Sequence, residues 1–180
     1  YEISLGLSII PVLMIFGALA LILFVALASY DPSDAAFSST GQQGPVENLI
    51  GPVGAWLSDL FFVLFGAPAY LFPLMLGVAG WSLYRERDDR QPASRRTLGL
   101  RGLGFALALA TSCGLATLHY ASGSLPSTAG GVLGALVGDG LASVMSFLGA
   151  TLLLLAVWLA SVSLFTGVSW LAVMDRIGQG

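Results

Sequence analysis

Very few side chains in this sequence could carry out chemistry. The chain has one histidine, His119, and one cysteine, Cys113, so a site with two imidazoles and an intrachain disulfide are both excluded. It has no lysine, so it cannot contain a Gly-x-x-x-x-Gly-Lys-Ser/Thr phosphate-binding loop. His119 stands beside Tyr120 at the end of an apolar stretch, where interfacial anchoring is a simpler role than catalysis. We therefore expect no catalytic residue, no metal site and no cofactor in this segment.

The composition is that of a membrane protein. Of the 180 residues, 56% are hydrophobic and only 9% are charged, and the mean hydropathy is +0.87. A soluble domain is about a quarter charged, so this chain cannot cover itself with a surface that water tolerates. Seven arginines against ten acidic residues give a net charge of −3. A nucleic-acid-binding surface needs a basic excess, so we expect no direct binding of nucleic acid.

Four apolar stretches could cross a membrane. The first, residues 5–28, would be roughly 36 Å long as a helix, which exceeds the ~30 Å hydrocarbon core of a bilayer. A signal peptide is the alternative for this stretch, but its apolar part usually has only about 7–15 residues and follows a basic segment. We expect an uncleaved span. The other stretches cover residues 51–84, 102–120 and 132–165.

The arginines predict the orientation of these spans. The connections at 29–50 and 121–130 contain no arginine, whereas 85–101 contains six of the seven. The positive-inside rule then places the 85–101 loop and both termini in the cytoplasm. Because acidic residues are interleaved with them, we interpret the six as topology determinants rather than as a binding patch. They are Arg85, Arg87, Arg90, Arg95, Arg96 and Arg101.

The second and fourth stretches are too long for one crossing. Each has about 33 residues, or roughly 50 Å as a single helix. Gly66 with Pro68 in the second and Gly149 in the fourth are candidate helix breaks, because glycine weakens a helix and proline lacks a donor. The crossings would then be residues 68–84 and 147–165. One long tilted helix in each stretch is the alternative.

The segments before these breaks would be short helices at the outer membrane surface, at 52–65 and 130–146. Asp59 and Asp139 support this placement, since an aspartate at mid-bilayer costs a few kcal/mol and costs less near water. Both segments share a Gly-x-x-Gly start, an aspartate five residues later and a Gly-Ala step, and they align with one small insertion. The sequence thus predicts a weak two-fold repeat with both halves in the same orientation.

Small residues predict close helix packing in two places. The third span is rich in them, including Gly102 and Gly104, and Gly130, Gly134 and Gly138 form a stripe at helical spacing. Such residues let helices approach closely. Packing within one domain and an oligomer contact are both consistent with this pattern.

Five segments, in order and spacing, resemble a known family. They are Ser-Tyr-Asp-Pro-Ser-Asp at 29–34, Asn-Leu-Ile-Gly-Pro-Val-Gly-Ala-Trp-Leu-Ser-Asp at 48–59, Phe-Gly-Ala-Pro-Ala-Tyr-Leu at 65–71, Ala-Gly-Gly-Val-Leu-Gly at 129–134 and Thr-Gly-Val-Ser-Trp at 166–170. Together they resemble the N-terminal four-span membrane domain of the FtsK/SpoIIIE septal DNA translocases of bacteria. The resemblance covers nearly the whole chain.

The resemblance implies a membrane anchor at the division septum of the bacterial inner membrane. In that family the anchor holds a hexameric, ATP-driven DNA pump and contacts other division proteins. The linker and motor that follow it there are absent from these residues, and the family's catalytic and DNA-reading residues have no positions here. Asp31, Asp34 and Glu47 are candidate partner contacts, although Asp31 to Asp34 is also a typical turn after a helix.

We therefore predict an all-α membrane domain with four transmembrane helices and no enzymatic activity of its own. Its expected partners are the lipid bilayer, division-site membrane proteins and further copies of the chain. The alternative is half of a small-molecule transporter or channel, because broken helices at corresponding positions in two halves are typical of transporters. That reading needs converging polar groups, which are scarce here.

Overall fold

The computed structural model describes residues 2–41, 45–85 and 95–166, and every regular element in these ranges is helical. The predicted all-helical fold is thereby confirmed for this part of the chain. The elements are α1 (Glu2–Ala28), α2 (Pro52–Phe65), a 3₁₀ turn η1 (Ala67–Tyr70), α3 (Leu71–Arg85), α4 (Arg95–His119), α5 (Gly131–Gly134), a π-helical turn η2 (Ala135–Asp139) and α6 (Gly140–Thr166).

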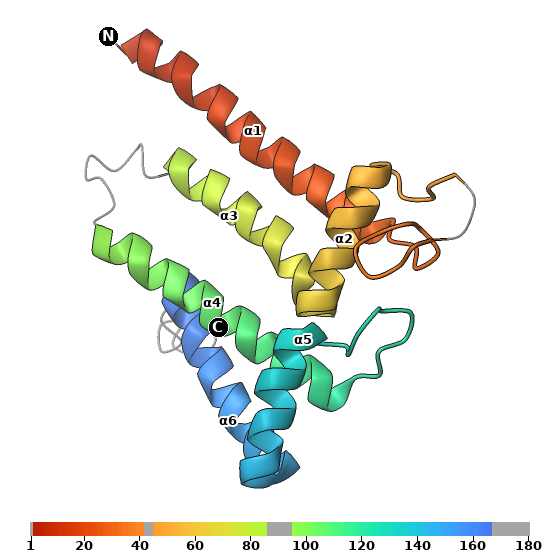
Figure 1. Cartoon of the computed structure of the whole chain (residues 1–180). Helices are drawn as coiled ribbons and strands as arrows, with labels where there is room; N and C mark the ends of the chain where they lie inside the picture. Colours follow the sequence, from red (N-terminus) through yellow and green to blue (C-terminus); the bar gives the residue numbers. More distant parts are fainter. Residues whose placement is uncertain (1, 42–44, 86–94, 167–180) are drawn as a thin grey trace, which may run out of the picture.

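The helices form two similar halves. Helix α1 packs along α3 in the first half, and α4 packs along α6 in the second. In Figure 1 the connections 29–51 and 120–130 lie at one end of these pairs, and the start of α1, the end of α3 and the start of α4 lie at the other. The two halves therefore run in the same direction, as the sequence repeat predicts.

The first half is broken at Gly66. Helix α2 ends at Phe65, and Gly66 has φ 60 and ψ −147, a conformation that is essentially restricted to glycine. Pro68 follows inside η1, where its fixed φ suits the first residues of a new helix. Residues 51–84 are therefore two helices with a sharp turn between them, not one long tilted helix.

The second half is broken at Ser146, not at Gly149 as the sequence predicted. Ser146 has φ 69 and ψ 162, whereas Gly149 lies within the helical part of α6. A glycine inside a helix costs only about 1 kcal/mol relative to alanine, so it does not force a break. The positive-φ residues Gly51 and Gly66 are 15 positions apart, and so are Gly131 and Ser146. The halves thus align over this segment without the insertion that the sequence comparison assumed.

The arginine-rich connection is shorter than predicted. Helix α4 begins at Arg95, so residues 95–101 are helical rather than part of a loop. Arginine and leucine favour helix, and no proline follows Pro92 in this region. Arg85 is the last residue of α3, while Arg87 and Arg90 lie outside the described residues.

Within residues 2–41, 45–85 and 95–166, two helical segments are long and apolar enough to cross a membrane. They are Leu98–His119, with 22 residues and a mean hydropathy of 1.4, and Gly131–Thr166, with 36 residues and a mean hydropathy of 2.2, which contains the break at Ser146. Shorter apolar helices cover Leu13–Ala28, Pro52–Phe65 and Ala67–Trp81.

The halves meet where the first one breaks. The N–H of Ala67 donates to the carbonyl of Ala129 over 2.8 Å, and the Cys113 thiol donates to the carbonyl of Phe65 over 3.3 Å. The ring of Phe72 lies 5.6 Å from that of Phe105 on α4. Backbone, thiol and aromatic contacts thus join α2, η1 and α3 to the second half.

Candidate functional site

The connection 29–51 folds over α2 and buries Asp59. Only 1% of Asp59 is exposed, and its carboxylate accepts hydrogen bonds from the hydroxyl of Tyr30 (3.1 Å), the N–H of Ser38 (2.5 Å) and the hydroxyl of Ser38 (2.9 Å). Burial raises the pKa of Tyr30, and the hydrogen bond to the Asp59 carboxylate raises it further. The sequence predicts a place near water for Asp59, whereas in the structure residues of the connection, Tyr30 and Ser38, cover it.

A second carboxylate ties the two ends of this connection together. Asp34 is 5% exposed and accepts hydrogen bonds from the N–H groups of Glu47 (2.8 Å) and Asn48 (3.0 Å). The amide of Asn48 in turn donates to the carbonyls of Ala26 (2.8 Å) and Ser29 (3.1 Å) and satisfies the end of α1. The prediction of Asp34 as a partner contact is therefore wrong, because its carboxylate is buried and used inside the domain.

The other two predicted contact residues remain at the surface. Asp31 accepts hydrogen bonds from the hydroxyl (2.5 Å) and the N–H (2.7 Å) of Ser33, and these bonds hold the pKa of its carboxyl below the usual range. Asp31 thus forms the turn after a helix that the sequence offered as the alternative to a partner contact. Glu47 is exposed, and its backbone N–H donates to the Asp34 carboxylate.

The corresponding aspartate of the second half has no such cover. Asp139 is exposed on η2, and no residue in the described ranges donates a hydrogen bond to it. The connection that precedes it, 120–130, is about half as long as 29–51. This difference in connection length is the sequence signal that distinguishes the two aspartates.

The glycine stripe is used for packing inside the chain. A Cβ atom at Gly130 or Gly134 would overlap the main chain of Cys113, and one at Gly138 would lie 2.6 Å from the carbonyl oxygen of Gly114. Any side chain here would push α5 and η2 away from α4. The stripe is therefore occupied by α4 and is not a free oligomer surface.

Gly102 and Gly104 of α4 differ in how closely α6 approaches them. A Cβ atom at Gly104 would lie 2.6 Å from the backbone nitrogen of Phe165 on α6, so this glycine allows the two helices to approach. A Cβ atom at Gly102 would meet nothing within 4 Å. Of the two predicted packing residues in this helix, only Gly104 has a close neighbour.

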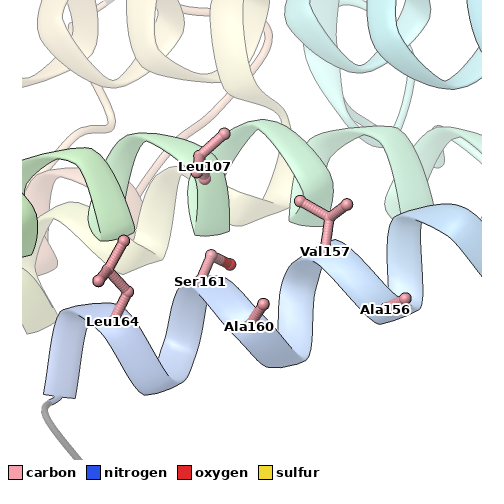
Figure 2. A pocket seen from close by; sticks show the side chains of 6 residues that line it. All are labelled: Leu107, Ala156, Val157, Ala160, Ser161 and Leu164. Atoms are coloured by element: carbon pink, nitrogen blue, oxygen red, sulfur yellow. The ribbon is translucent and has the colours of Figure 1, made fainter.

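A groove runs between α4 and α6 (Figure 2). Its volume is about 300 Å³. The hydroxyl in its lining belongs to Ser161 and donates to the carbonyl of Trp158 over 2.8 Å, so it is already satisfied. The groove therefore offers no group for acid–base catalysis or ligation. Its lining consists of Leu107, Ala156, Val157, Ala160, Ser161 and Leu164.

No group of three or more His, Cys, Asp or Glu residues that could hold a metal ion occurs within the described ranges. His119 lies at the end of α4, with its Nε2 atom 3.1 Å from the hydroxyl of Thr151 and its ring 5.1 Å from that of Phe147. The Thr151 hydroxyl donates to the carbonyl of Phe147 over 2.9 Å, so its proton is held by the α6 backbone and not by the imidazole. The candidate functional feature of the described ranges is thus the network around Asp59 and Asp34 at the end that carries the connections.

Comparison with known proteins identifies the family. Residues 10–178 match the model of the 4TM region of DNA translocase FtsK/SpoIIIE. The chain belongs to this family. The resemblance indicated by the sequence motifs is thereby confirmed, and the chain is a membrane region of the family.

Named relatives align over most of this chain but over little of their own length. The chain is 38% identical over 168 residues to the DNA translocase FtsK of Pseudomonas putida, covering 93% of this chain and 20% of the relative. It is 37% identical over 167 residues to the DNA translocase FtsK of Vibrio vulnificus, covering 92% and 17%. No solved structure matches the chain. The chain thus spans about a fifth of the length of these relatives. As a member of the 4TM family it is a multi-pass inner-membrane domain.

Proposed function

We propose that this chain is the membrane anchor and septum-targeting domain of a cell-division DNA translocase involved in chromosome segregation. The observation that carries the proposal is the match of nearly the whole chain to the FtsK/SpoIIIE 4TM region and to proteins named DNA translocase FtsK. The segment anchors the protein, and the ATP-driven movement of DNA belongs to a motor outside these residues.

In this proposal four helical segments cross the membrane: α1, η1 with α3, α4, and the part of α6 after Ser146. The connections 29–51 and 120–130 face the outside, and both termini and the arginine-rich connection face the cytoplasm. This arrangement is supported by the common direction of the two halves in Figure 1. The short helices before the two breaks, α2 and residues 131–145, lie at the outer membrane surface.

The folded connection 29–51 is the surface that this domain offers to division-site membrane proteins. Its described parts, residues 29–41 and 45–51, are held in place by hydrogen bonds of Asp34, Asn48 and Asp59. Asp31 and Glu47 are the charged side chains that remain at its surface. The domain itself contacts lipid, division proteins and further copies of the chain, with six copies around the motor by resemblance to the family, and it does not bind nucleic acid.

Family membership favours this anchor over half of a transporter or channel. The structure also gives the transporter reading little support, because Asp59 is engaged by the connection and the α4–α6 groove is apolar. A transport site needs polar groups around the broken helices.

The test is the distribution of a fluorescent fusion to these 180 residues in dividing bacteria. We expect the fusion to accumulate at the septum. A second fusion with Asp31→Asn and Glu47→Gln should remain in the membrane with reduced septal accumulation, because the connection keeps its fold but loses its exposed charges. A uniform membrane signal from the unaltered fusion would contradict the targeting role and leave the segment a passive tether.

A further inference from the structure

The two halves contact each other through surfaces that are not equivalent in the repeat. The break of the first half, at Leu64, Phe65, Gly66 and Ala67, lies against Ala129 and Gly131 at the start of the short helix of the second half. A Cβ atom at Gly131 would lie 2.5 Å from the main chain of Leu64. In a two-fold symmetric contact, the break of the second half would lie in the same way against residues 49 and 51.

Those corresponding surfaces are open. The repeat that aligns Gly51 with Gly131 and Gly66 with Ser146 also aligns Leu49 with Ala129, and Phe147 with Ala67. A Cβ atom at Gly51 would meet nothing within 4 Å, and Leu49 is 78% exposed. In Figure 1 the first break lies in the middle of the molecule beside α5, whereas the second break lies at its lower edge.

The residues around the second break are apolar and exposed. Val144 is 83% exposed, and Met145, Phe147 and Leu148 are also exposed. Their counterparts in the first half, from Leu64 to Pro68, form the contact between the halves. Each half therefore has two surfaces of this kind, its helix break and the start of its short helix. Only one of the two takes part in the contact between the halves, and the other is exposed.

The long helices show the same pattern. Cys113 and Phe105 on α4 contact the first break and α3, through Phe65 and Phe72 respectively. Counted back from the helix ends at Ala28 and His119, their counterparts on α1 are Ile22 and Met14. Both are exposed large hydrophobic residues, at 46% and 68%.

From this incomplete repeat we infer that the break of the second half binds a second copy of this chain. It contacts residues 49–53 and the adjoining face of α1 in that copy. The contact that joins the two halves within one chain is thereby repeated between chains. The N–H of Phe147 then faces the carbonyl of Leu49 of the neighbour, as that of Ala67 faces Ala129. Such a head-to-tail contact links chains in a ring or a row. Since the halves are parallel, all copies keep one orientation in the membrane. The inference rests on the proposed homo-oligomer and names its contact surface.

Cysteine pairs in the native full-length protein test this contact. With Cys113→Ser as the background, we expect the Leu49→Cys/Phe147→Cys variant to give a ladder of disulfide-linked chains on mild oxidation in native membranes. Each single variant should give about tenfold less bridged product, because two identical positions do not meet and bridging needs Cα atoms within about 7 Å. A mixture of the two single variants should give dimers without the ladder.

Two further pairs serve as controls. The Ala67→Cys/Ala129→Cys variant should bridge within the chain, because these residues are hydrogen-bonded neighbours. The Leu74→Cys/Phe147→Cys variant should not link chains, although Leu74 is also well exposed. If the 67/129 pair bridges and the 49/147 pair leaves the chains unlinked, the inference is wrong. Dimers from either single variant would indicate a two-fold contact and also overturn it.

Two additional readouts separate this inference from the proposals on which it rests. If differently tagged copies co-purify from membranes while the 49/147 pair fails to bridge, the homo-oligomer stands and the head-to-tail surface is wrong. Copies that neither co-purify nor bridge overturn both. Septal accumulation of the fusion is scored separately, so loss of targeting with intact bridging would count against the anchor function alone.

Discussion

Asp59 and Asp139 occupy equivalent positions in the repeat, yet they have different environments. Asp59 is buried with three hydrogen bonds, and Asp139 is exposed. The carboxylate itself does not decide this, since the residue type and the local sequence pattern are shared. The cause is the preceding connection, which is long enough to bring Tyr30 and Ser38 over Asp59 in one half only.

Replacement of Asp59 by asparagine should therefore destabilise the folded connection. The amide oxygen can still accept hydrogen bonds. The NH₂ group, which takes the place of the other carboxylate oxygen, cannot accept from the N–H of Ser38. A buried donor without a partner costs about 1–3 kcal/mol. We expect Asp59→Asn to lower the free energy of unfolding in detergent by this amount and to speed hydrogen exchange in residues 30–41.

Asp139→Asn is the matched control, because it makes the same chemical change at the equivalent position. We expect its free energy of unfolding to stay within about 0.5 kcal/mol of the unaltered chain, as is usual for surface substitutions. If both variants lost the same free energy of unfolding, the hydrogen bonds from Tyr30 and Ser38 would not stabilise the connection.

At the scale of the elements, the glycines separate into those that break a helix and those that let helices touch. Gly66 adopts a conformation that strongly favours glycine, whereas Gly130, Gly134 and Gly138 lie against α4. The second break falls on Ser146, which adopts a positive φ that residues with a side chain rarely adopt.

Exchanging Gly138 for alanine tests the packing role. The added Cβ would lie 2.6 Å from the carbonyl oxygen of Gly114, so η2 and α4 would have to separate. Overpacking of this kind costs about 1–3 kcal/mol. We expect a lower midpoint of thermal unfolding for Gly138→Ala in detergent.

Gly102→Ala is the control on α4. A Cβ atom added at Gly102 would meet nothing within 4 Å beyond its own turn of helix, and alanine is favoured over glycine inside a helix by about 0.5–1 kcal/mol. Its midpoint of unfolding should rise or stay unchanged. If both variants shifted the midpoint in the same direction, the glycine stripe would not be a packing surface.

These elements also show what the sequence can predict. The helical character, the repeat and the turn after Phe65 depend on local signals such as apolar runs, Gly66 and Pro68, and these are readable from the chain. The burial of Asp34 and Asp59 depends on residues 13 to 29 positions away in the sequence, which no local pattern reveals. The break at Ser146 is not predicted for a different reason, because Gly149 three residues later is the stronger local signal.

The whole molecule consists of two parallel halves joined at the first break, and its ends differ chemically. The end with the connections carries Asp31 and Glu47, whereas the opposite end holds the end of α3 with Arg85 and the start of α4 with Arg95 and Arg96. Arginine resists transfer across a membrane, so this asymmetry favours one orientation of the entire domain.

Thiol labelling in intact spheroplasts measures this orientation directly. In a Cys113→Ser background, we expect a membrane-impermeant maleimide to label Thr40→Cys and Ser122→Cys, which are exposed positions in the two connections. Ser94→Cys, in the arginine-rich connection, should be labelled only after lysis. Because the two connections belong to different halves, labelling of one without the other would mean that the halves are antiparallel in the membrane. Labelling of Ser94→Cys in intact cells, with the other two protected, would reverse the orientation and place the arginines outside.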